Sequence, residues 1–246
     1  MQHRSKKIKK SFFIILVVLI VLSGGSAIYL SNYYHSVDVE KYMNGSSEVS
    51  VEKFDKGWFF DGVGEEKALI FYPGAKVATE AYAPLMYQLA ESGIDCFLVD
   101  MPFHMAFFGM NRAEEIMQEY NYEAWYLGGH SLGGAMAANF AADYVEDHTD
   151  GIRGLLLLAA YPTKDLSTSD MSVVTVYGSE DGVLNMDKIV AGRELMPQDY
   201  KEVCIEGGNH AQFGSYGAQK GDGTAAIPAE DQWARTVEVF VGDESE

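Results

Sequence analysis

Short apolar runs alternate with helix-like segments along most of this chain, and this alternation restricts its possible folds more than any other feature. Each run is almost continuously apolar, so a strand formed by it must be covered on both faces, as in a parallel sheet. Helical crossovers between the strands supply that cover. We therefore predict an α/β fold, with a mainly parallel central sheet and helices on both faces, in one domain over residues 47–246. The predicted strands are Ala68–Tyr72, Ile94–Met101, Ala124–Leu127, Gly154–Ala160, Val173–Tyr177 and Tyr200–Glu206.

The predicted helices lie between or after these strands, and a hairpin precedes them. The hairpin strands are Glu48–Phe54 and Trp58–Asp61, with the turn at Lys56-Gly57. Apolar residues recur with helical spacing in the first helix, and a glycine follows it directly. The predicted helices are Thr79–Ser92, Arg112–Tyr120, Leu132–Val145, Met186–Leu195 and Asp231–Val241.

A basic cluster followed by an apolar run marks the N-terminus as a targeting segment. Phe12–Leu30 holds nineteen residues without a charge, about the length that crosses ~30 Å of hydrocarbon. Residues 1–11 carry five basic residues and no acid, so the positive-inside rule keeps them in the cytoplasm. We therefore predict a single-pass transmembrane signal anchor over 12–30, with the domain outside. A cleaved signal peptide is the alternative, because the shorter run Phe12–Leu22 precedes the small residues Gly25-Ser26-Ala27.

Charge and composition limit the partners of the exported part. Residues 31–46 are polar and rich in tyrosine, and we expect a stalk between bilayer and domain. The whole chain has a formal net charge of −18, and beyond residue 34 it holds 13 basic against 36 acidic residues, or −23. A body this acidic repels phosphate backbones, which argues against nucleic acid as a partner.

The two cysteines, Cys96 and Cys204, each lie within an apolar run that is predicted to form a strand. An exported chain could pair them, but well-separated central strands do not meet the Cα spacing of a disulfide. We expect both to be free and buried, where cysteine behaves as a small apolar residue. Neither has the spacing of a metal ligand, and no metal is expected.

The segment Gly129-His130-Ser131-Leu132-Gly133 fits the pattern G-x-S-x-G. A bare match is a weak signal, and a glycine-rich turn with an incidental serine is the alternative. Here, however, the match follows a predicted strand directly and opens a predicted helix, which is the context that the motif requires. The sharp turn strains the serine backbone, so the positions two before and two after it must lack bulk. Ser131 is therefore the candidate nucleophile.

A serine needs a base to take its proton and a third group to orient that base. In this topology the acid and then the histidine follow the serine along the chain, on loops after later strands. Asp181 and His210 occupy those two places. Glu180 is the competitor of Asp181. The other histidines fit less well as the base: His104 could at most line the site, and His130 is the neighbour of the serine.

Two backbone N–H groups are candidates for the oxyanion hole, which needs preorganised donors. Leu132 follows the nucleophile at the start of a helix, where the helix dipole also favours an anion. The second donor should come from the loop after the strand Ala68–Tyr72, where Pro73-Gly74-Ala75 makes the N–H of Ala75 the candidate. A simple β-turn at Pro73-Gly74 is compatible with this role.

With these motifs in order, the sequence resembles the α/β-hydrolase superfamily over roughly residues 47–242. In particular it resembles small bacterial members of the dienelactone-hydrolase type, which share YPGAKV-like, GGHSLGG, YGSEDG and GGNHAQFG segments. The resemblance implies that Ser131 is the nucleophile, His210 the base and Asp181 the acid. One departure is Tyr72-Pro73 in place of the common His-Gly pair, which leaves Ala75 less secure than Leu132. Members of this group are mostly hydrolases of undefined substrate.

The resemblance also bears on the pocket. Many lipases insert a helical lid where this chain has only twelve residues, 161–172, so an open site is expected. Residues in loops near the crevice could form an apolar acyl wall, although ordinary core and loop positions are the alternative for about half of them. Gly221-Asp222-Gly223-Thr224 resembles part of a calcium loop, but with a single acid it is read as a turn. The candidate substrate-binding residues are Tyr72, Phe103, His104, Phe107, Tyr161 and Phe213.

The sequence therefore predicts a membrane-tethered serine hydrolase outside the cytoplasm, which acts on small carboxylic esters or related acyl compounds. No metal or organic cofactor is implied, and the expected partners are a small acyl substrate and the lipid bilayer. A non-catalytic binding protein on the same fold is one alternative, since fold does not imply function. An acyltransferase or a peptidase is another, because both share the acyl-enzyme chemistry.

Overall fold

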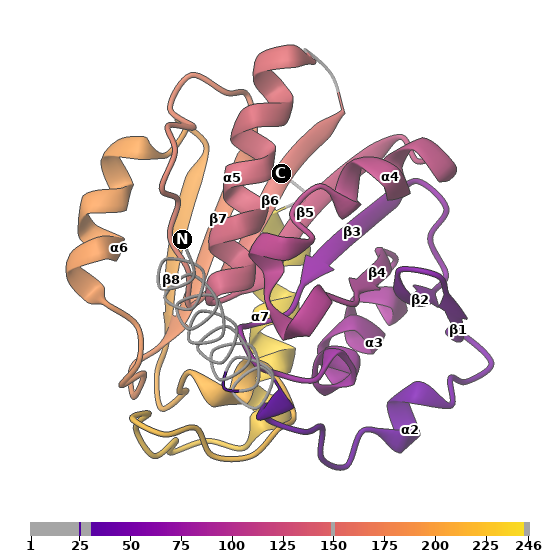
Figure 1. Ribbon diagram of the computed structural model, residues 1–246, viewed down its shortest axis with the longest axis vertical. Coiled ribbons are helices and arrows are strands. Elements are labelled where there is room, and N and C mark those ends of the chain that lie inside the picture. The colour runs from indigo at the N-terminus through magenta and orange to yellow at the C-terminus, as the bar shows by residue number, and fades with distance from the viewer. Residues whose placement is uncertain (1–24, 26–30, 149–150, 244–246) are drawn as a thin grey trace, which may run out of the picture. The chain divides into compact units, whose positions relative to one another are not determined.

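Eight strands form one twisted sheet in the order β1-β2-β4-β3-β5-β6-β7-β8 (Figure 1). The computed structural model describes residues 25, 31–148 and 151–243. β1 and β2 form a hairpin, β2 runs antiparallel to β4, and every other neighbouring pair is parallel. The mainly parallel sheet is thus confirmed. The strands are Ser50–Phe54, Gly57–Asp61, Lys67–Tyr72, Asp95–Val99, Ala124–His130, Ile152–Leu158, Ser172–Gly178 and Tyr200–Ile205, for β1 to β8.

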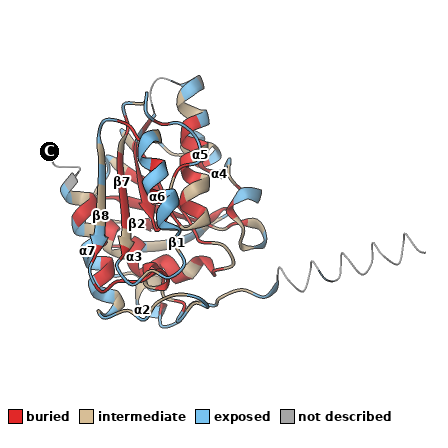
Figure 2. Ribbon diagram, turned by 90° about the vertical axis from the view of Figure 1, so that its left-hand side faces the viewer, coloured by how far each residue is buried: buried red, intermediate tan, exposed pale blue. Residues whose placement is uncertain are grey.

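Helices cover both faces of the sheet, as the apolar runs predict. On one face α3 (Ala83–Glu91) and α7 (Ala229–Asp243) pack against each other and the strands. On the other face lie α4 (Arg112–Glu119) and α5 (Leu132–Asp147). Figure 2 shows the buried strands between helices whose outer sides are exposed. The remaining helices are α2 (Glu40–Met43), α6 (Met186–Gly192) and the 3₁₀ turns η1 (Thr79–Tyr82), η2 (Pro102–His104), η3 (Ala106–Phe108), η4 (Arg193–Leu195) and η5 (Ala211–Phe213).

Successive residues of a central strand enter opposite halves of the core. In β3, Leu69 and Phe71 join the cluster under α3 and α7, whereas Ala68 and Ile70 join the cluster under α4 and α5. This follows from the alternation of side chains along a strand. It explains why the run is continuously apolar, because neither face of β3 is left to solvent.

Two predicted helices divide, and one predicted strand is longer than expected. The segment 79–92 forms η1 and then α3, with Pro84 in the first turn of α3. Proline suits that turn because it has no N–H to donate and its φ is fixed near the helical value. The predicted helix at 186–195 divides into α6 and η4. β5 continues past Leu127 to His130, because its glycines keep pairing with β6.

The predicted stalk is largely part of the domain. Tyr34 forms a parallel bridge with Val77, and its N–H and C=O bond the backbone of the loop after β3. The N–H of Val37 donates to the carbonyl of Ser215 at 2.8 Å, and Val39 is buried in the core. The compact unit therefore begins at Tyr34 rather than at residue 47. The reason is that apolar and aromatic side chains in this polar segment find partners far along the sequence.

The cysteines lie on strands that are far apart in the sheet, and both are free thiols. β4 holds Cys96 and β8 holds Cys204, with β3, β5, β6 and β7 between them. At roughly 4.8 Å per strand the two side chains cannot pair within one chain. Cys96 is buried as expected, but Cys204 is exposed. Its burial was wrongly expected because β8 is an edge strand with one poorly covered face.

The proposed signal anchor at residues 12–30 lies outside the described residues except for Gly25, and so do residues 1–11. In the part of the chain that the structure describes, no helix has the length and apolarity to span a bilayer. The anchor remains a prediction from the sequence.

Candidate active site

Ser131 sits in a strained backbone conformation between β5 and α5. Its φ of 55° and ψ of −122° fall in a region that side chains other than glycine rarely adopt. Such a residue costs on the order of 1–3 kcal/mol and persists only where its surroundings hold it. Here the N–H of Ser131 donates to Leu158 O at 2.8 Å, and its carbonyl accepts from the N–H of Ala135. The strain lifts the serine side chain out of both the strand and the helix.

The glycines on either side of Ser131 allow the turn to touch the end of β3. A Cβ atom on Gly133 would lie 2.1 Å from the carbonyl oxygen of Tyr72 and 2.4 Å from that of Pro73. One on Gly129 would lie 2.7 Å from the same Tyr72 oxygen. Backbone thus packs on backbone where the motif requires small residues, which agrees with the steric reason for its glycines.

Asp181 and His210 meet in the loops after β7 and β8. The Nδ1 of His210 lies 2.8 Å from Oδ2 of Asp181, and both side chains are only 2% exposed. The other carboxylate oxygen accepts from the N–H groups of Val183 at 2.9 Å and Leu184 at 2.7 Å. The competing acid, Glu180, is exposed and contacts the hydroxyl of Ser179 instead.

Ser131 and His210 open into one cavity of about 260 Å³. No hydrogen bond joins the Oγ of Ser131 to the imidazole among the described residues, so only the acid side of the triad is connected by such a bond. Catalytic hydrogen bonds are often loose without substrate and tighten in the complex. The rest of the cavity wall is mostly apolar and consists of Leu132, Ala135, Ala159, Ala160, Tyr161, Val183, Leu184 and Asn185.

The two candidate oxyanion donors lie on either side of the contact between the turn and β3. In the loop after β3, the N–H groups of Gly74, Lys76 and Val77 all have acceptors. Those of Ala75 and Leu132 have none within residues 31–148 and 151–243. Because backbone N–H groups are nearly always paired, two free donors at this place are available to a ligand.

Asp222 holds the acid loop to the histidine loop, and sequence reasoning missed it. Its Oδ1 accepts from the N–H groups of Gly182 at 3.0 Å, His210 at 3.3 Å and Gly223 at 2.9 Å. Its Oδ2 accepts from that of Ala211 at 2.8 Å. The segment was interpreted as a turn, and a lone acid between glycines was the only available signal. Asp222 is therefore a candidate positioning residue.

Tyr82 and His130 form a second buried network beside the site that the sequence did not reveal. The hydroxyl of Tyr82 accepts from the N–H of Gly74 at 3.0 Å and lies 2.8 Å from Nδ1 of His130. The ring of His130 is 4.4 Å from that of His210, and its Nε2 has no partner among the described residues. Burial, followed by the charge of His210, lowers the pKa of His130 well below its ordinary value. A neutral imidazole thus packs behind the candidate base.

Two predicted substrate-binding residues, Tyr72 and Phe213, lie in the core. Neither is exposed at all. The hydroxyl of Tyr72 donates to Met110 O and accepts from the N–H of Ala113, at the start of α4. Phe213 packs against His130, with ring centroids 5.7 Å apart. Tyr72 fails as a wall residue because the last side chain of β3 points under α4 rather than into the crevice.

The other predicted wall residues have different surroundings. Tyr161 lines the cavity with Ser131, as expected. Phe103 and Phe107 are exposed on the loop after β4 and are not part of that wall. His104 is partly buried, and its carbonyl accepts from the N–H of Lys76. The described residues between β6 and β7 form no helix, so no helical lid covers the cavity from this loop.

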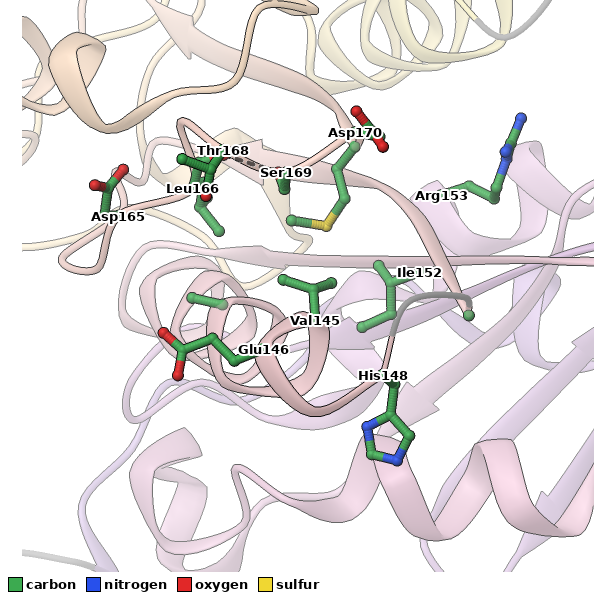
Figure 3. A pocket seen from close by; sticks show the side chains of 13 residues that line it. Val145, Glu146, His148, Ile152, Arg153, Asp165, Leu166, Thr168, Ser169 and Asp170 are labelled. Atoms are coloured by element: carbon green, nitrogen blue, oxygen red, sulfur yellow. Dashed lines mark hydrogen bonds between the residues drawn. The ribbon is translucent and has the colours of Figure 1, made fainter.

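A second hollow, of about 450 Å³, lies at the opposite edge of the sheet (Figure 3). It is lined by the end of α5, the start of β6 and the chain before β7. Its acidic, basic and imidazole side chains lie apart from one another in Figure 3; they are Glu146, His148, Arg153, Asp165 and Asp170. None of the described residues forms a group of three metal-ligating side chains, here or elsewhere.

Comparison with known families identifies the fold family. The model of the alpha/beta hydrolase family matches residues 68–234, well over half of the chain. The matched segment contains Ser131, Asp181 and His210. A comparison with curated proteins finds no match.

Many solved structures share this fold at low sequence identity. Carboxyl esterase 2 from the fungus Tuber melanosporum is 13% identical, with a TM-score of 0.60 over 85% of this chain and 89% of its own. Carboxylesterase CesB from Bacillus subtilis is 8% identical, with a TM-score of 0.55 over 83% and 96%. A monoacylglycerol lipase from Paleococcus ferrophilus is 14% identical, with a TM-score of 0.56 over 80% and 99%.

The contact between the serine turn and β3 predicts a strong effect of one methyl group. Gly133→Ala should lower the free energy of unfolding by about 1–3 kcal/mol or more, because the new Cβ meets backbone that cannot move aside. It should also abolish labelling of Ser131 by an active-site serine probe. Gly242→Ala is the control, since nothing lies within 4 Å of a Cβ there. Urea unfolding in mild detergent measures the stability of the two variants. Equal free energies of unfolding for Gly133→Ala and Gly242→Ala would contradict the contact.

The buried His130 predicts a pH-dependent stability. Its folded pKa is lowered, so between that value and the unfolded value near ~6.5 the unfolded chain binds a proton that the folded chain does not. The stability that the neutral His130 contributes is fully present above pH ~6.5. As the pH falls below that value, the free energy of unfolding decreases by up to about 1.4 kcal/mol per pH unit. His130→Gln should flatten the curve of unfolding free energy below pH ~6.5. Above it, the two curves should run parallel, and an unchanged slope below it would refute this role.

Proposed function

The chain belongs to the alpha/beta hydrolase family, and we propose that it is a serine hydrolase that cleaves small carboxylic esters or related acyl compounds. One observation carries the proposal. His210, which is bonded to the buried carboxylate of Asp181, lines the same cavity as a serine held in a strained turn. An incidental serine in a glycine-rich turn has no reason to share a cavity with a histidine oriented by a buried carboxylate.

The proposed reaction proceeds through an acyl-enzyme. The Oγ of Ser131 attacks the substrate carbonyl carbon while Nε2 of His210 takes its proton. The carbonyl oxygen becomes an oxyanion, which the N–H groups of Leu132 and Ala75 stabilise. The intermediate collapses, the bond to the leaving oxygen breaks, and His210 returns the proton to that oxygen. Water then repeats the sequence on the acyl-enzyme and releases the carboxylic acid.

Asp181 supports each proton transfer without being protonated itself. Its Oδ2 accepts the Nδ1–H of His210, which leaves Nε2 free to act as the base. It also stabilises the imidazolium that forms in the transition state. Because Val183 and Leu184 donate to its other oxygen, the carboxylate is already fixed before substrate arrives.

The shape of the site supports an ester with a modest acyl or alcohol group. A cavity of about 260 Å³ lies just below the range of ~300–1,000 Å³ that is usual for ligand pockets, and Ala135, Ala159 and Ala160 keep its wall open. Structural neighbours named as carboxylesterases and a lipase are consistent with ester substrates.

The triad assignment predicts an order of effects among three variants. Ser131→Ala should abolish ester hydrolysis and labelling by a fluorophosphonate probe. Asp181→Asn should lower turnover by up to ~10⁴, because the histidine loses its correct tautomer and its charge stabilisation. Glu180→Gln is the matched control and should have little effect, since that carboxylate faces solvent.

The measurement is a panel of acyl esters, amides and thioesters assayed with each variant. If Glu180→Gln strongly lowers turnover and Asp181→Asn does not, the assignment of Asp181 as the acid is wrong, while the hydrolase proposal stands. If the folded protein is not labelled at all, or if the Ser131→Ala variant is labelled as strongly as the parent, a binding protein on this fold becomes the better hypothesis. Preference for an acceptor other than water would instead indicate an acyltransferase.

We further propose that residues 12–30 anchor the chain in the cytoplasmic membrane with the domain outside. The support is the charge pattern, with five basic residues before the apolar run and an acidic body after it. Protease added to spheroplasts should digest the domain and spare a cytoplasmic marker protein. Protection until the membrane is lysed would refute the orientation, and release of the domain into the medium would indicate signal cleavage.

A further inference from the structure

Three phenylalanine side chains form an exposed apolar patch on the loop between β4 and α4. Phe103 is 60%, Phe107 49% and Phe108 51% exposed. The rings contact one another, since the centroid of Phe108 lies 4.1 Å from that of Phe107 and 5.6 Å from that of Phe103. Contiguous exposed apolar side chains mark a contact surface. We call these three residues the phenylalanine patch.

The loop that carries the patch has a fixed, strained backbone. Phe103 and His104 are consecutive, neither is glycine, and their φ angles are 57° and 55°. Such a residue persists only where other contacts hold it. Here the N–H of His104 donates to Met101 O at 2.9 Å, and its carbonyl accepts from the N–H of Lys76 at 2.8 Å. The patch is therefore held outward by the fold.

The patch lies close to the point where the N-terminal chain joins the domain. The N–H of Tyr34 donates to the carbonyl of Lys76 at 2.7 Å, and the N–H of Lys76 donates to that of His104. A single residue thus links the start of the domain to the loop of the patch. Only residues 31–33 separate Tyr34 from the apolar run 12–30. Three residues reach at most about 11 Å.

We propose that the phenylalanine patch inserts into the interface of the bilayer that holds the N-terminal run. This inference rests on the proposed anchor and, for its substrate, on the proposed hydrolase activity. A tether of three residues keeps the surface beside Tyr34 at the headgroups, and that surface bears the exposed rings. Since the exported part carries a charge of −23, anionic headgroups repel it. The apolar rings and the tether, rather than basic residues, make the contact.

The contact assigns a substrate class to the site. The turn η3 holds Phe107 and Phe108 and packs against α5, the helix that begins directly after Ser131. In this proposal the chain of the ester stays in the bilayer while its carbonyl enters the cavity of Ser131. The charge of the domain disfavours anionic lipids. The substrate is a bilayer-resident carboxylic ester without a net negative charge.

A fluorescent label on the patch tests the contact without any need for activity. The full chain carries Cys204→Ser, which removes the exposed thiol and leaves only the fully buried Cys96. Phe107→Cys is labelled with a polarity-sensitive dye and reconstituted in phosphatidylcholine vesicles that contain nitroxide lipids. The matched control is Val63→Cys, which is 63% exposed in the loop between β2 and β3, at the opposite edge of the sheet from Ser131.

The nitroxide lipids should quench the label at 107 and leave the label at 63 unquenched, and high salt should not change this. Equal quenching at both positions, or none at 107, overturns the proposal. A chain that does not float with the vesicles overturns it as well, because the anchor has then failed.

The substrate is tested with the triple variant Phe103→Ser, Phe107→Ser, Phe108→Ser. Turnover of diacylglycerol in vesicles and of soluble p-nitrophenyl acetate is divided by the amount of enzyme that a fluorophosphonate labels, which corrects for misfolded protein. The ratio of diacylglycerol turnover to p-nitrophenyl acetate turnover should fall roughly tenfold. A tenfold loss corresponds to the partial burial of one or two phenylalanine rings in the bilayer. An unchanged ratio overturns the substrate class. If Ser131 is not labelled even in the parent chain, the hydrolase proposal fails, and the quenching experiment still decides the membrane contact.

Discussion

The close approach of two backbones at the end of β3 is the constraint on which the candidate active site depends. The strained turn at Ser131 stands directly against the carbonyls of Tyr72 and Pro73, with no side chain between them. This contact brings the nucleophile and the loop that holds Ala75 to the same place. A side chain at Gly133 would separate them, so the serine and the candidate oxyanion donor are positioned by one steric requirement.

The candidate acid and base are held by backbone donors rather than by long side chains. Asp181 accepts from two N–H groups of its own loop, and Asp222 accepts from N–H groups of both loops. Short bonds to the backbone leave these two carboxylates little freedom to reorganise.

The sequence predicted the parts that depend on local pattern and chain order. Continuous apolar runs identified the strands because both faces of the sheet are covered, and the order of Ser131, Asp181 and His210 identified the residues that the structure brings together. Asp222, Tyr82 and His130 were missed as partners because their roles depend on contacts between loops that are distant in sequence. The docking of Tyr34 beside Val77 was missed for the same reason.

The bonds between the first and last parts of the domain have a consequence for the order of assembly. Val37 pairs with Ser215, and the hydroxyl of Tyr34 accepts from the N–H of Lys220, across more than 170 residues of chain. The residue that joins the acid loop to the histidine loop, Asp222, also comes late. A nascent chain that stops short of this residue lacks part of the site, however well its earlier strands have formed. The centre around Ser131 is therefore completed only after residue 222 has been synthesised and the two loops have met.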